Sequence, residues 1–414
     1  MARQTFSLAI AALVAAMTIA PAQSKVIAIR FGTLVDGTGK SISDAVVVVT
    51  GERITSVGKG NGAVPKGAEV MDLRAYTGIP GLIDLHTHMT YYWNRAPGTK
   101  PGGRGTPNPP VTPELVAENG KRTLETGVTT VRDLGASRGL DITTRDMINA
   151  GTLVGPRMFV AGQGISAGRA GTGPNPDAMT QQTLTRLGTT ADWVKVYGSR
   201  GSFDVVDGTQ TLTFEEMKAI VDAAHAANRP VAIHSYGPSG VKDAVRAGAD
   251  SVEHGIDLDD ETIADMKKRG TVWVPTIDHN RYYVDSVDEY GFKPEAVGPL
   301  RDYIQKNLES TARAFKAGVK IGMGSDAVYS GFGQNTGELG WFIKAGMTPA
   351  QALQTATTIP AALLGHAKDL GAVAAGYFAD IVAVEGDPLK DINVVMTKVK
   401  WVMKGGAVVV DKRK

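Results

Sequence analysis

The pattern of hydrophobic and polar positions divides the chain into two strand-rich ends and a different middle. Near both ends, short apolar runs alternate with Gly, Asp and Thr residues, which is typical of β-strands joined by tight turns. Two examples are V-I-A-I-R-F-G-T-L-V, which starts at Val26, and A-D-I-V-A-V, which starts at Ala379. We therefore predict one small β-sandwich domain that is assembled from both chain ends, residues 23–79 and 367–414.

The middle of the chain alternates short apolar runs with amphipathic segments. Apolar residues recur at helical spacing in Phe214–Asn228 and Asp260–Gly270, for example. The predicted strands between such segments are Pro80–Leu85, Thr129–Leu134, Arg157–Ala161, Trp193–Tyr197, Pro230–Ile233, Ser251–Glu253, Val272–Pro275 and Lys320–Gly324. Eight strand–helix units in about 285 residues match the size of a (β/α)8 barrel. The predicted fold class is therefore α/β, with a TIM-like barrel over residues 80–366.

Composition excludes several classes of function. Hydrophobic residues make up 43% of the chain and charged residues 21%, a balance that excludes wholesale disorder. The 44 basic and 42 acidic residues nearly cancel and form no basic run, so we expect a small-molecule substrate and no nucleic-acid partner. The chain has no cysteine, which excludes disulfides, a thiol nucleophile and Cys-ligated metals. Any metal must therefore bind to histidine, carboxylate or an unusual ligand.

The first residues have the layout of a secretory signal peptide. Arg3 is followed by an apolar run over residues 6–20, and residues 20–22 form an Ala-Pro-Ala sequence that resembles a cleavage site. We predict that residues 1–22 are removed and that the protein is exported, periplasmic or secreted, without stable membrane association afterwards. The alternative is an uncleaved anchor, because the run is close to the shortest length that spans a bilayer.

Polar side chains that bind metals follow the predicted strands. D-L-H-T-H places His86 and His88 at the end of the first strand, on one face because they are two positions apart. His234, His254 and Asp326 follow the fifth, sixth and eighth strands. In a (β/α)8 barrel the carboxyl ends of the strands form the active site. We therefore expect these side chains to meet there.

Lys195 is the unusual residue of the predicted barrel, because it lies inside the apolar run W-V-K-V-Y. A lysine is almost never fully buried without a partner, and burial lowers the pKa of its amine. One interpretation is that the side chain reaches along the strand to solvent. The other is that CO2 carboxylates the neutral amine, which makes an anionic bidentate ligand. A site with a single Asp needs such an anion to balance two divalent cations.

These residues together resemble the amidohydrolase superfamily. The resemblance rests on G-L-I-D-L-H-T-H, on the lysine of the fourth strand, on the two later histidines and on G-S-D-A. It extends to the carboxyl-terminal G-Y-F-A-D-I-V-A-V-E-G-D-P-L and so covers nearly the whole chain after the signal peptide. It implies a distorted barrel with two divalent ions, expected to be Zn2+. The implied ligands are His86, His88 and Asp326 for one ion, His234 and His254 for the other, and carboxylated Lys195 as the bridge.

Such a centre implies a binuclear metal-dependent amidohydrolase. Two ions that share a water lower its pKa, and the resulting metal-bridging hydroxide attacks the carbonyl of an amide. Asp326 is the expected proton shuttle to the leaving amine. The alternatives are a hydrolase of carbamate, ester, lactone or organophosphate bonds, a mononuclear deaminase, and a non-enzymatic scaffold on the same fold. A deaminase would not need Lys195, and scaffold relatives lose ligands that this chain retains.

Segments such as G-V-T-T-V-R-D-L-G and S-V-E-H-G resemble one branch of the superfamily. This branch holds imidazolonepropionase-like hydrolases, Xaa-Pro dipeptidases and ochratoxin-type amidohydrolases. It implies cleavage of an amide beside a free carboxylate, in a peptide-like substrate, an N-acyl amino acid or an aryl amide, by a homo-oligomer. It also implies that Tyr236 contacts the substrate carboxylate or the developing oxyanion.

Other residues near the predicted site have two interpretations each. The Gly-Gly-His that this branch often carries after the third strand is replaced by G-Q-G-I-S-A-G-R, so Arg169 either binds a carboxylate or is solvated. This departure puts dipeptide substrates in doubt. His279 either faces the substrate or is an ordinary loop residue. We assign no role to His225 and His366.

The connection after the first strand cannot be a helix, because nine of the sixteen residues 95–110 are Gly or Pro. It is either a loop over the barrel mouth or a flexible insertion. The aromatic residues before it, Tyr91, Tyr92 and Trp93, either form an apolar wall for an aryl or acyl group or pack under the loop.

Overall fold

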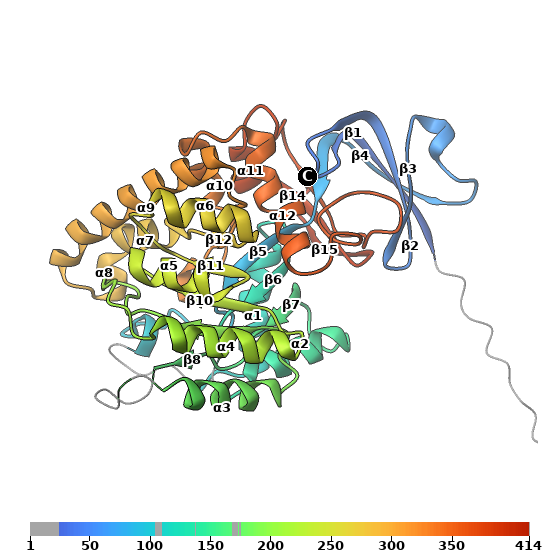
Figure 1. Ribbon diagram of the computed structural model, residues 1–414. Coiled ribbons are helices and arrows are strands. Elements are labelled where there is room, and N and C mark those ends of the chain that lie inside the picture. The colour runs from blue at the N-terminus through green and yellow to red at the C-terminus, as the bar shows by residue number, and fades with distance from the viewer. Residues whose placement is uncertain (1–24, 104–109, 137, 168–172, 174, 414) are drawn as a thin grey trace, which may run out of the picture.

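The computed structural model describes residues 25–103, 110–136, 138–167, 173 and 175–413. The predicted signal peptide, part of the Gly- and Pro-rich loop and Arg169 lie outside these residues, so the predictions about them stay predictions. Among the described helices, none is long and apolar enough to cross a membrane. Figure 1 shows helices packed around parallel strands and, beside them, a β-sheet to which both chain ends contribute.

Both chain ends contribute strands to one seven-stranded sheet, in the order β15-β14-β13-β4-β1-β2-β3. Its strands are β1 (Val26–Val35), β2 (Ser41–Thr50), β3 (Arg53–Lys59), β4 (Glu69–Pro80), β13 (Ile381–Val384), β14 (Val399–Lys404) and β15 (Ala407–Asp411). β4 and β13 join the two ends, with Pro80 opposite Ile381. The ends thus meet in one sheet, as the hydrophobic pattern predicts, while the sandwich and its domain bounds stay predictions.

The middle of the chain forms two parallel sheets, in the orders β5-β6-β7 and β12-β11-β10-β9-β8. Their strands are β5 (Leu82–Thr87), β6 (Val128–Asp133), β7 (Arg157–Val160), β8 (Ile165–Ser166), β9 (Val194–Tyr197), β10 (Val231–His234), β11 (Ser251–Glu253) and β12 (Val272–Val274). The first seven predicted strands are present with small shifts at their ends, and β8 was not predicted. The fold is therefore α/β with parallel sheets.

The predicted strand Lys320–Gly324 is not a regular strand in the structure. Within it, Ile321 makes one isolated bridge, to Trp273 of β12, instead of a continuous ladder. On one side, Leu85 N of β5 donates a hydrogen bond to Met323 O at 2.9 Å. On the other side, Trp273 N of β12 donates to Lys320 O, also at 2.9 Å. The segment therefore lies between β12 and β5 and joins the two parallel sheets.

Helices cover the parallel strands from outside (Figure 1). The described α-helices are α1 (Pro113–Leu124), α2 (Leu140–Asn149), α3 (Pro176–Leu187), α4 (Phe214–Ala226), α5 (Pro238–Ala247), α6 (Asp260–Arg269), α7 (Ile277–Asp285), α8 (Val287–Tyr290), α9 (Val297–Ala317), α10 (Glu338–Lys344), α11 (Pro349–Thr355), α12 (Thr358–Leu363) and α13 (Asn393–Thr397), of which α13 contacts β14 of the seven-stranded sheet. A capping box starts α4, in which Thr213 and Glu216 each accept the backbone N–H of the other. Gly270 ends α6 with a left-handed φ of 78°. Both predicted helices thus form, slightly shorter than expected.

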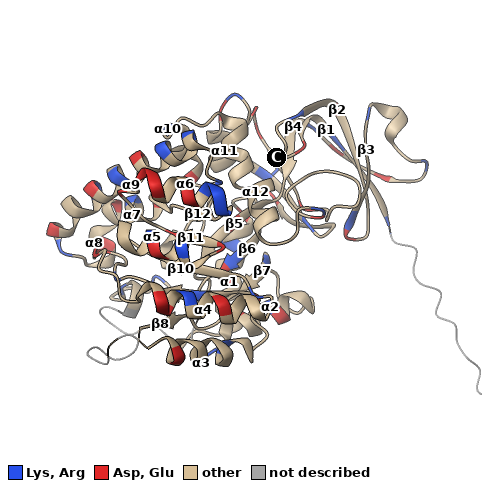
Figure 2. Cartoon of the chain, viewed as in Figure 1, with Lys and Arg blue, Asp and Glu red and all other residues tan. Residues whose placement is uncertain are grey.

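Short 3₁₀ turns complete the described structure, at Asn61–Ala63, Pro101–Gly103, Pro294–Ala296 and Tyr329–Gly331. Charged residues of both signs alternate on the outer helices, and Figure 2 shows Lys and Arg next to Asp and Glu along α4, α6 and α9. The mixed surface fits the net formal charge of +2.

Apolar side chains fill the space between strands and helices. One buried cluster contains Val196, Ile233, Val252 and Trp273 from β9 to β12, with residues of α4 and α5 packed against them. Because apolar residues occupy the middle of the strands, the polar residues gather at the carboxyl ends, where a barrel of this type has its active site.

Candidate functional site

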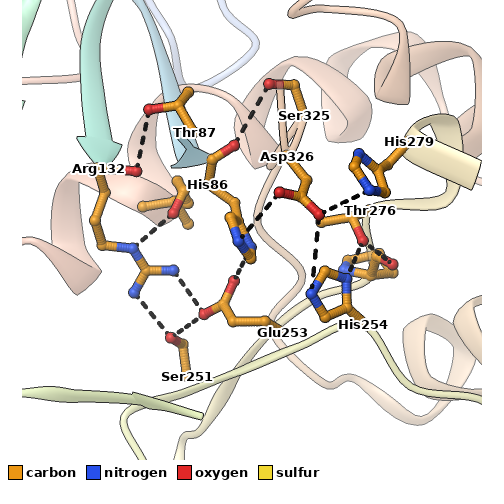
Figure 3. Close-up of polar contacts among 12 residues, drawn as sticks. His86, Thr87, Arg132, Ser251, Glu253, His254, Thr276, His279, Ser325 and Asp326 are labelled. Carbon is orange, nitrogen blue, oxygen red and sulfur yellow. Dashed lines mark hydrogen bonds and ion pairs between the residues drawn. The ribbon is translucent and has the colours of Figure 1, made fainter. Parts of the chain in front are cut away.

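The carboxyl ends of the parallel strands place four histidines around Asp326. One carboxylate oxygen, Oδ1, lies 3.5 Å from Nε2 of His86 and 3.3 Å from Nε2 of His88. The other oxygen, Oδ2, lies 4.0 Å from Nε2 of His254 and 3.1 Å from Nε2 of His279 (Figure 3). The ligand atoms of His86, His88 and Asp326 lie within 4.8 Å of one another, and all three residues are buried. These three residues form a candidate metal site.

Lys195 and His234 complete the predicted set around the same cavity. The ring centroids of His234 and His254 are 4.6 Å apart. Both rings, Lys195 and Asp326 line a cavity of about 120 Å³. His86 is fully buried next to Asp326. The structure therefore brings together all six residues of the predicted set, while their roles as ligands stay a prediction.

The amine of Lys195 is buried without a hydrogen-bond partner. The residue is 1% exposed in β9, so its side chain does not reach solvent. Among the described residues, none makes a hydrogen bond to its Nζ. Burial lowers the pKa of this amine to about 8, although the negative charges of Glu253 and Asp326 act to raise it. A fraction of the amine is therefore neutral near neutral pH, and a buried group of this kind needs a binding partner.

Burial also keeps histidines of the site neutral. Together with a smaller effect of Lys195, it lowers the pKa of His86 to about 4 and that of His234 to about 3. The pKa of His254 is lowered by burial and by His234. Neutral imidazole is the form that binds a metal ion. Nε2 of His86 is buried without a hydrogen-bond partner in the described part of the chain, so its lone pair is free.

Buried contacts orient His86. Its Nδ1–H donates to Glu253 Oε2 at 2.9 Å, and Glu253 Oε1 accepts from Arg132 Nη2 at 2.8 Å (Figure 3). Arg132 also donates to the backbone oxygen of Leu85 at 2.7 Å. Burial raises the pKa of Glu253, but Arg132 and His86 outweigh this effect and hold the pKa at about 2. The ionised carboxylate therefore fixes the proton of His86 on Nδ1 and leaves Nε2 toward Asp326.

Two other histidines are oriented in the same way. His88 Nδ1–H donates to the backbone oxygen of Gly135 at 3.2 Å, since a carbonyl only accepts. His254 Nδ1–H donates to Thr276 Oγ1 at 2.6 Å, because that hydroxyl donates its own proton to a backbone carbonyl. In both rings, Nε2 is left on the side of Asp326.

Three residues of the site have left-handed backbone conformations, namely His254 (φ 67°), Thr276 (φ 51°) and Asp326 (φ 48°). Such a conformation costs a non-glycine residue on the order of 1–3 kcal/mol and persists only where surrounding contacts enforce it. Strained backbone of this kind gathers at functional sites. The strain thus marks the same place as the candidate metal ligands.

The chain matches a known family over most of its length, since the sequence profile of the amidohydrolase family covers residues 77–409. The chain belongs to the amidohydrolase family. This amidohydrolase is 29% identical to ochratoxinase of Aspergillus niger over an alignment of 430 positions, which covers 93% of this chain and 86% of that protein. It is 27% identical to imidazolonepropionase of Cereibacter sphaeroides over 396 residues, which cover 87% of this chain and 92% of that protein.

Solved structures include similar folds. The crystal structure of a Xaa-Pro dipeptidase with bound methionine has a TM-score of 0.82 to this amidohydrolase and 31% sequence identity, over 93% of this chain and 99% of that chain. The branch predicted from the sequence is therefore confirmed. Family membership identifies the amidohydrolase as an enzyme, a hydrolase that acts on amide carbon–nitrogen bonds.

Sequence reasoning missed residues that support the candidate ligands of this amidohydrolase. Asp84 accepts two hydrogen bonds from Ser325, from the backbone N at 2.9 Å and from Oγ at 2.6 Å. It thereby ties the first parallel strand to Ser325, in the loop that follows the segment Lys320–Gly324. Asp84, Arg132 and Glu253 are fully buried. Asp84 lies inside the apolar run G-L-I-D-L, which is the pattern that singled out Lys195, so the same signal would have found it. Arg132 and Glu253 each have a charged or polar neighbour, Asp133 and His254, so that signal does not mark them.

Two predicted substrate contacts of the amidohydrolase, Tyr236 and His279, line the cavity. Tyr236 is 1% exposed, and its ring centroid lies 5.1 Å from that of His234. Burial raises the pKa of the Tyr236 hydroxyl well above its usual value, so the hydroxyl stays protonated and can donate a hydrogen bond. His279 lies at the start of α7 and contacts Asp326, so it faces the site and is not an ordinary loop residue.

The remaining histidines of the amidohydrolase pair with carboxylates and do not line this cavity. His225 contacts Asp250 and His366 contacts Asp369, at 2.8 Å and 2.9 Å respectively. The prediction for Arg169 falls on a residue outside the described part of the chain.

The aromatic residues after the first parallel strand divide between the two interpretations. Tyr91 lines the cavity and stacks on His88, whereas its two neighbours pack elsewhere. The Tyr92 hydroxyl donates to Glu118 and the Trp93 indole N–H donates to Thr99, both at 2.8 Å. Tyr91 alone of the three therefore belongs to the cavity wall.

Residues from other loops of the amidohydrolase complete that wall. Tyr197, Phe203 and Val328 line the cavity, and none of them was predicted from the sequence. The described start of the Gly- and Pro-rich loop lies beside α8, where Lys100 Nζ donates to the backbone oxygen of Asp288 at 2.8 Å. This contact favours a loop packed on the protein over a free insertion.

Proposed function

We propose that this amidohydrolase hydrolyses an amide bond with two divalent ions, Zn2+ by preference, at the carboxyl ends of strands that close into a (β/α)8 barrel. The proposed ligands are His86, His88 and Asp326 for one ion, His234 and His254 for the other, and carboxylated Lys195 as the bridge. The observation that carries the proposal is the buried Nζ of Lys195. It has no hydrogen-bond partner among the described residues, although histidines and a carboxylate line the same cavity.

The donor set fits divalent ions that prefer nitrogen and oxygen ligands. Nε2 of His86 is free, and the Nδ1 protons of His86, His88 and His254 are fixed by protein acceptors. When bound, the ions supply an activated water and polarise the carbonyl of the substrate. The side chains of this protein then determine how the substrate is held and where protons go.

Carboxylation of Lys195 needs only the neutral amine and CO2. The nitrogen forms a bond to the carbon of CO2 and releases one proton to solvent, which leaves a carbamate with one negative charge. The pKa of about 8 makes the neutral amine available for this step. The carbamate supplies the second anion that a cluster of histidines and Asp326 lacks.

Asp326 is the proposed proton carrier. Burial raises its pKa, but His279, His86 and His88 outweigh this effect and hold the pKa well below its usual value. The carboxylate is therefore ionised before the reaction and accepts a proton only as the attacking water loses it. Asp326 then gives this proton to the leaving amine. Tyr236 donates a hydrogen bond to the substrate carboxylate or to the oxyanion.

The cavity wall supports an uncharged, flat group beside the scissile bond. Tyr91, Tyr197, Phe203 and Val328 supply its apolar surface. Apart from histidine, the charged residues among the described lining residues belong to the proposed metal centre. Xaa-Pro dipeptidase, by its name, supports an amide between amino acids. We therefore propose N-acyl amino acids, dipeptides or aryl amides as the substrate class.

The test compares N-acyl amino acids and dipeptides with the same compounds capped as carboxyl-terminal amides. Hydrolysis of the free acids alone is expected. Tyr236→Phe is expected to lower kcat/KM on the order of 100-fold, because one hydrogen-bond donor to the transition state is lost. Tyr377→Phe is the matched control, since that hydroxyl donates to the backbone oxygen of Ala367 and does not line the cavity.

Other outcomes of this comparison are decisive too. Equal rates on acids and capped amides would exclude a contact to the substrate carboxylate, and with it the proposed hydrogen bond from Tyr236 to that carboxylate. No turnover of either set would contradict hydrolysis of N-acyl amino acids and dipeptides and direct the search to carbamates, aryl amides and esters.

Metal analysis of the purified protein is expected to find two ions per chain. A chelator is expected to remove them and to abolish turnover, and added Zn2+ is expected to restore it. One ion per chain would instead favour a mononuclear, deaminase-like site. No ion after preparation in metal-supplemented buffer would favour a non-enzymatic scaffold.

A further inference from the structure

The segment Asn335–Glu338 contacts both halves of the site without lining the cavity. We propose that this segment, called the brace below, is a positioning element that sets His279 and His86 against Asp326. The proposal rests on the proposed function for the roles of these three residues. The contacts of the brace can be tested without a substrate.

Glu338 caps helix α7 from a distant part of the chain. It is fully buried at the start of α10, and its two oxygens each accept one backbone N–H at 2.8 Å, from Ile277 and from Asp278. These are the first two residues of α7, and the preceding Thr276 provides no side-chain cap. The first N–H groups of a helix have no partner within the helix, and a carboxylate is favourable at this positive end. Glu338 therefore anchors the start of α7.

The start of α7 carries two contacts of the site. Thr276 Oγ1 accepts from Nδ1 of His254 at 2.6 Å, and Nε2 of His279 lies 3.1 Å from Oδ2 of Asp326. The φ of 51° at Thr276 is costly for a β-branched residue. Strained backbone persists only where outside contacts enforce it, and the hydrogen bonds to Glu338 directly follow this residue. Their loss would let the turn relax and would move both contacts.

Asn335 reaches the other half of the site. It is fully buried, and its Nδ2 donates to Asp84 Oδ2 at 3.0 Å. Asp84 in turn accepts from the backbone N of His86 at 3.1 Å and from the backbone N of Ser325 at 2.9 Å. Ser325 directly precedes Asp326. One side chain of the brace thus holds the carboxylate that links two of the proposed ligands.

Gly337 lets the brace lie directly against α7. A Cβ at this position would lie 2.2 Å from Asp278 Oδ2 and 2.7 Å from its Cγ. The Asp278 carboxylate cannot easily move away, because Arg281 donates to Oδ2 at 2.7 Å and the Trp341 indole donates to Oδ1 at 2.8 Å. Glycine is therefore required between the two contacting residues of the brace.

Glu338→Gln tests the brace, because it keeps the size of the side chain but places an amide NH2 against one of the two helix N–H groups. In the metal-loaded protein, deuterium exchange is expected to accelerate roughly tenfold at Ile277 and Asp278 and to stay unchanged in α4, which has its own capping box. The kcat for a substrate of the proposed class is expected to fall on the order of tenfold. KM is expected to change little, because the brace does not line the cavity. Burial raises the pKa of Glu338 to about 8, so both experiments are run above that pH.

The matched control is Glu215→Gln, an exposed residue in the first turn of α4. Through the start of α7, Glu338 acts on the contacts of His254 and of His279. In a His279→Ala background, the effect of Glu338→Gln on kcat is therefore expected to shrink, because only the contact of His254 is left. Unchanged exchange at the start of α7 would overturn the brace, and so would fully additive effects on kcat. If Glu338→Gln does not fold, Glu338→Asp replaces it with the same expectations, since its carboxylate is one methylene too short. Exchange needs no substrate, so failure of the proposed function leaves this test intact.

Discussion

Lys195→Met is expected to release bound metal and to lower kcat/KM on the order of 1000-fold. The thioether side chain has a similar length but cannot be carboxylated, so the site loses its bridging anion. Metal content per chain and steady-state kinetics measure the two effects. Lys218→Met is the matched control, because Lys218 is an exposed lysine on α4 that pairs with Asp222. Retention of both ions by Lys195→Met would contradict the bridging carbamate.

Lys195→Met is also expected to raise the stability of the metal-free protein. Nζ of Lys195 is buried without a hydrogen-bond partner among the described residues. Removal of an unsatisfied buried polar group recovers about 1–3 kcal/mol. The free energy of unfolding of metal-free Lys195→Met, measured with urea, should therefore rise. A fall would mean that the amine has a structural partner and is not kept for chemistry.

Arg132→Met is expected to lower the free energy of unfolding by about 3–5 kcal/mol. Arg132 is fully buried, and its Nη2 donates to Glu253 at 2.8 Å. Without the guanidinium, the carboxylate of Glu253 stays buried beside a neutral imidazole and a hydroxyl, which do not offset its desolvation. The weakened contact to His86 is also expected to lower metal affinity about 10- to 100-fold. Urea unfolding and metal titration measure these effects.

Two further variants sharpen the Arg132 experiment. Arg74→Met removes one partner of an exposed pair with Asp72, and little change in stability is expected from it. Adding Glu253→Gln to Arg132→Met should recover part of the lost stability, because the buried charge is then gone. If Arg132→Met lowers the free energy of unfolding by less than about 1 kcal/mol, the Arg132–Glu253 pair stabilises the fold no more than an exposed ion pair does, which would contradict the prediction.

The parallel strands and the residues at their ends could be predicted because both depend on local patterns. Short apolar runs mark strands, and the spacing of His86 and His88 fixes their common face. β8 has two residues, too few to form a recognisable apolar run. Lys320–Gly324 has the composition of a strand, but its backbone pairs only at one isolated bridge, between Ile321 and Trp273. Hydrophobic pattern indicates burial and does not determine hydrogen-bond geometry.

The contacts that support the candidate ligands could not be predicted because they join distant segments. Asp84 and Ser325 are 241 positions apart, and Arg132 and Glu253 are 121 positions apart. A charged residue inside an apolar strand has the same pattern whether it binds an ion or a partner on another strand. Phe203 lies in a loop, where no periodicity shows which way a side chain points. Only the arrangement of the strands resolves these cases.

The pairing of Pro80 with Ile381 sets the order in which the chain can fold. All strands of the two parallel sheets lie between these two residues in the sequence. During synthesis from the amino terminus, β4 therefore has no neighbour on this side until almost the whole chain has left the ribosome. Pairing over so long a separation is slow, and until then the growing chain carries an unpaired strand edge. For a chain with the predicted signal peptide, this delay suits transport across a membrane before folding is complete.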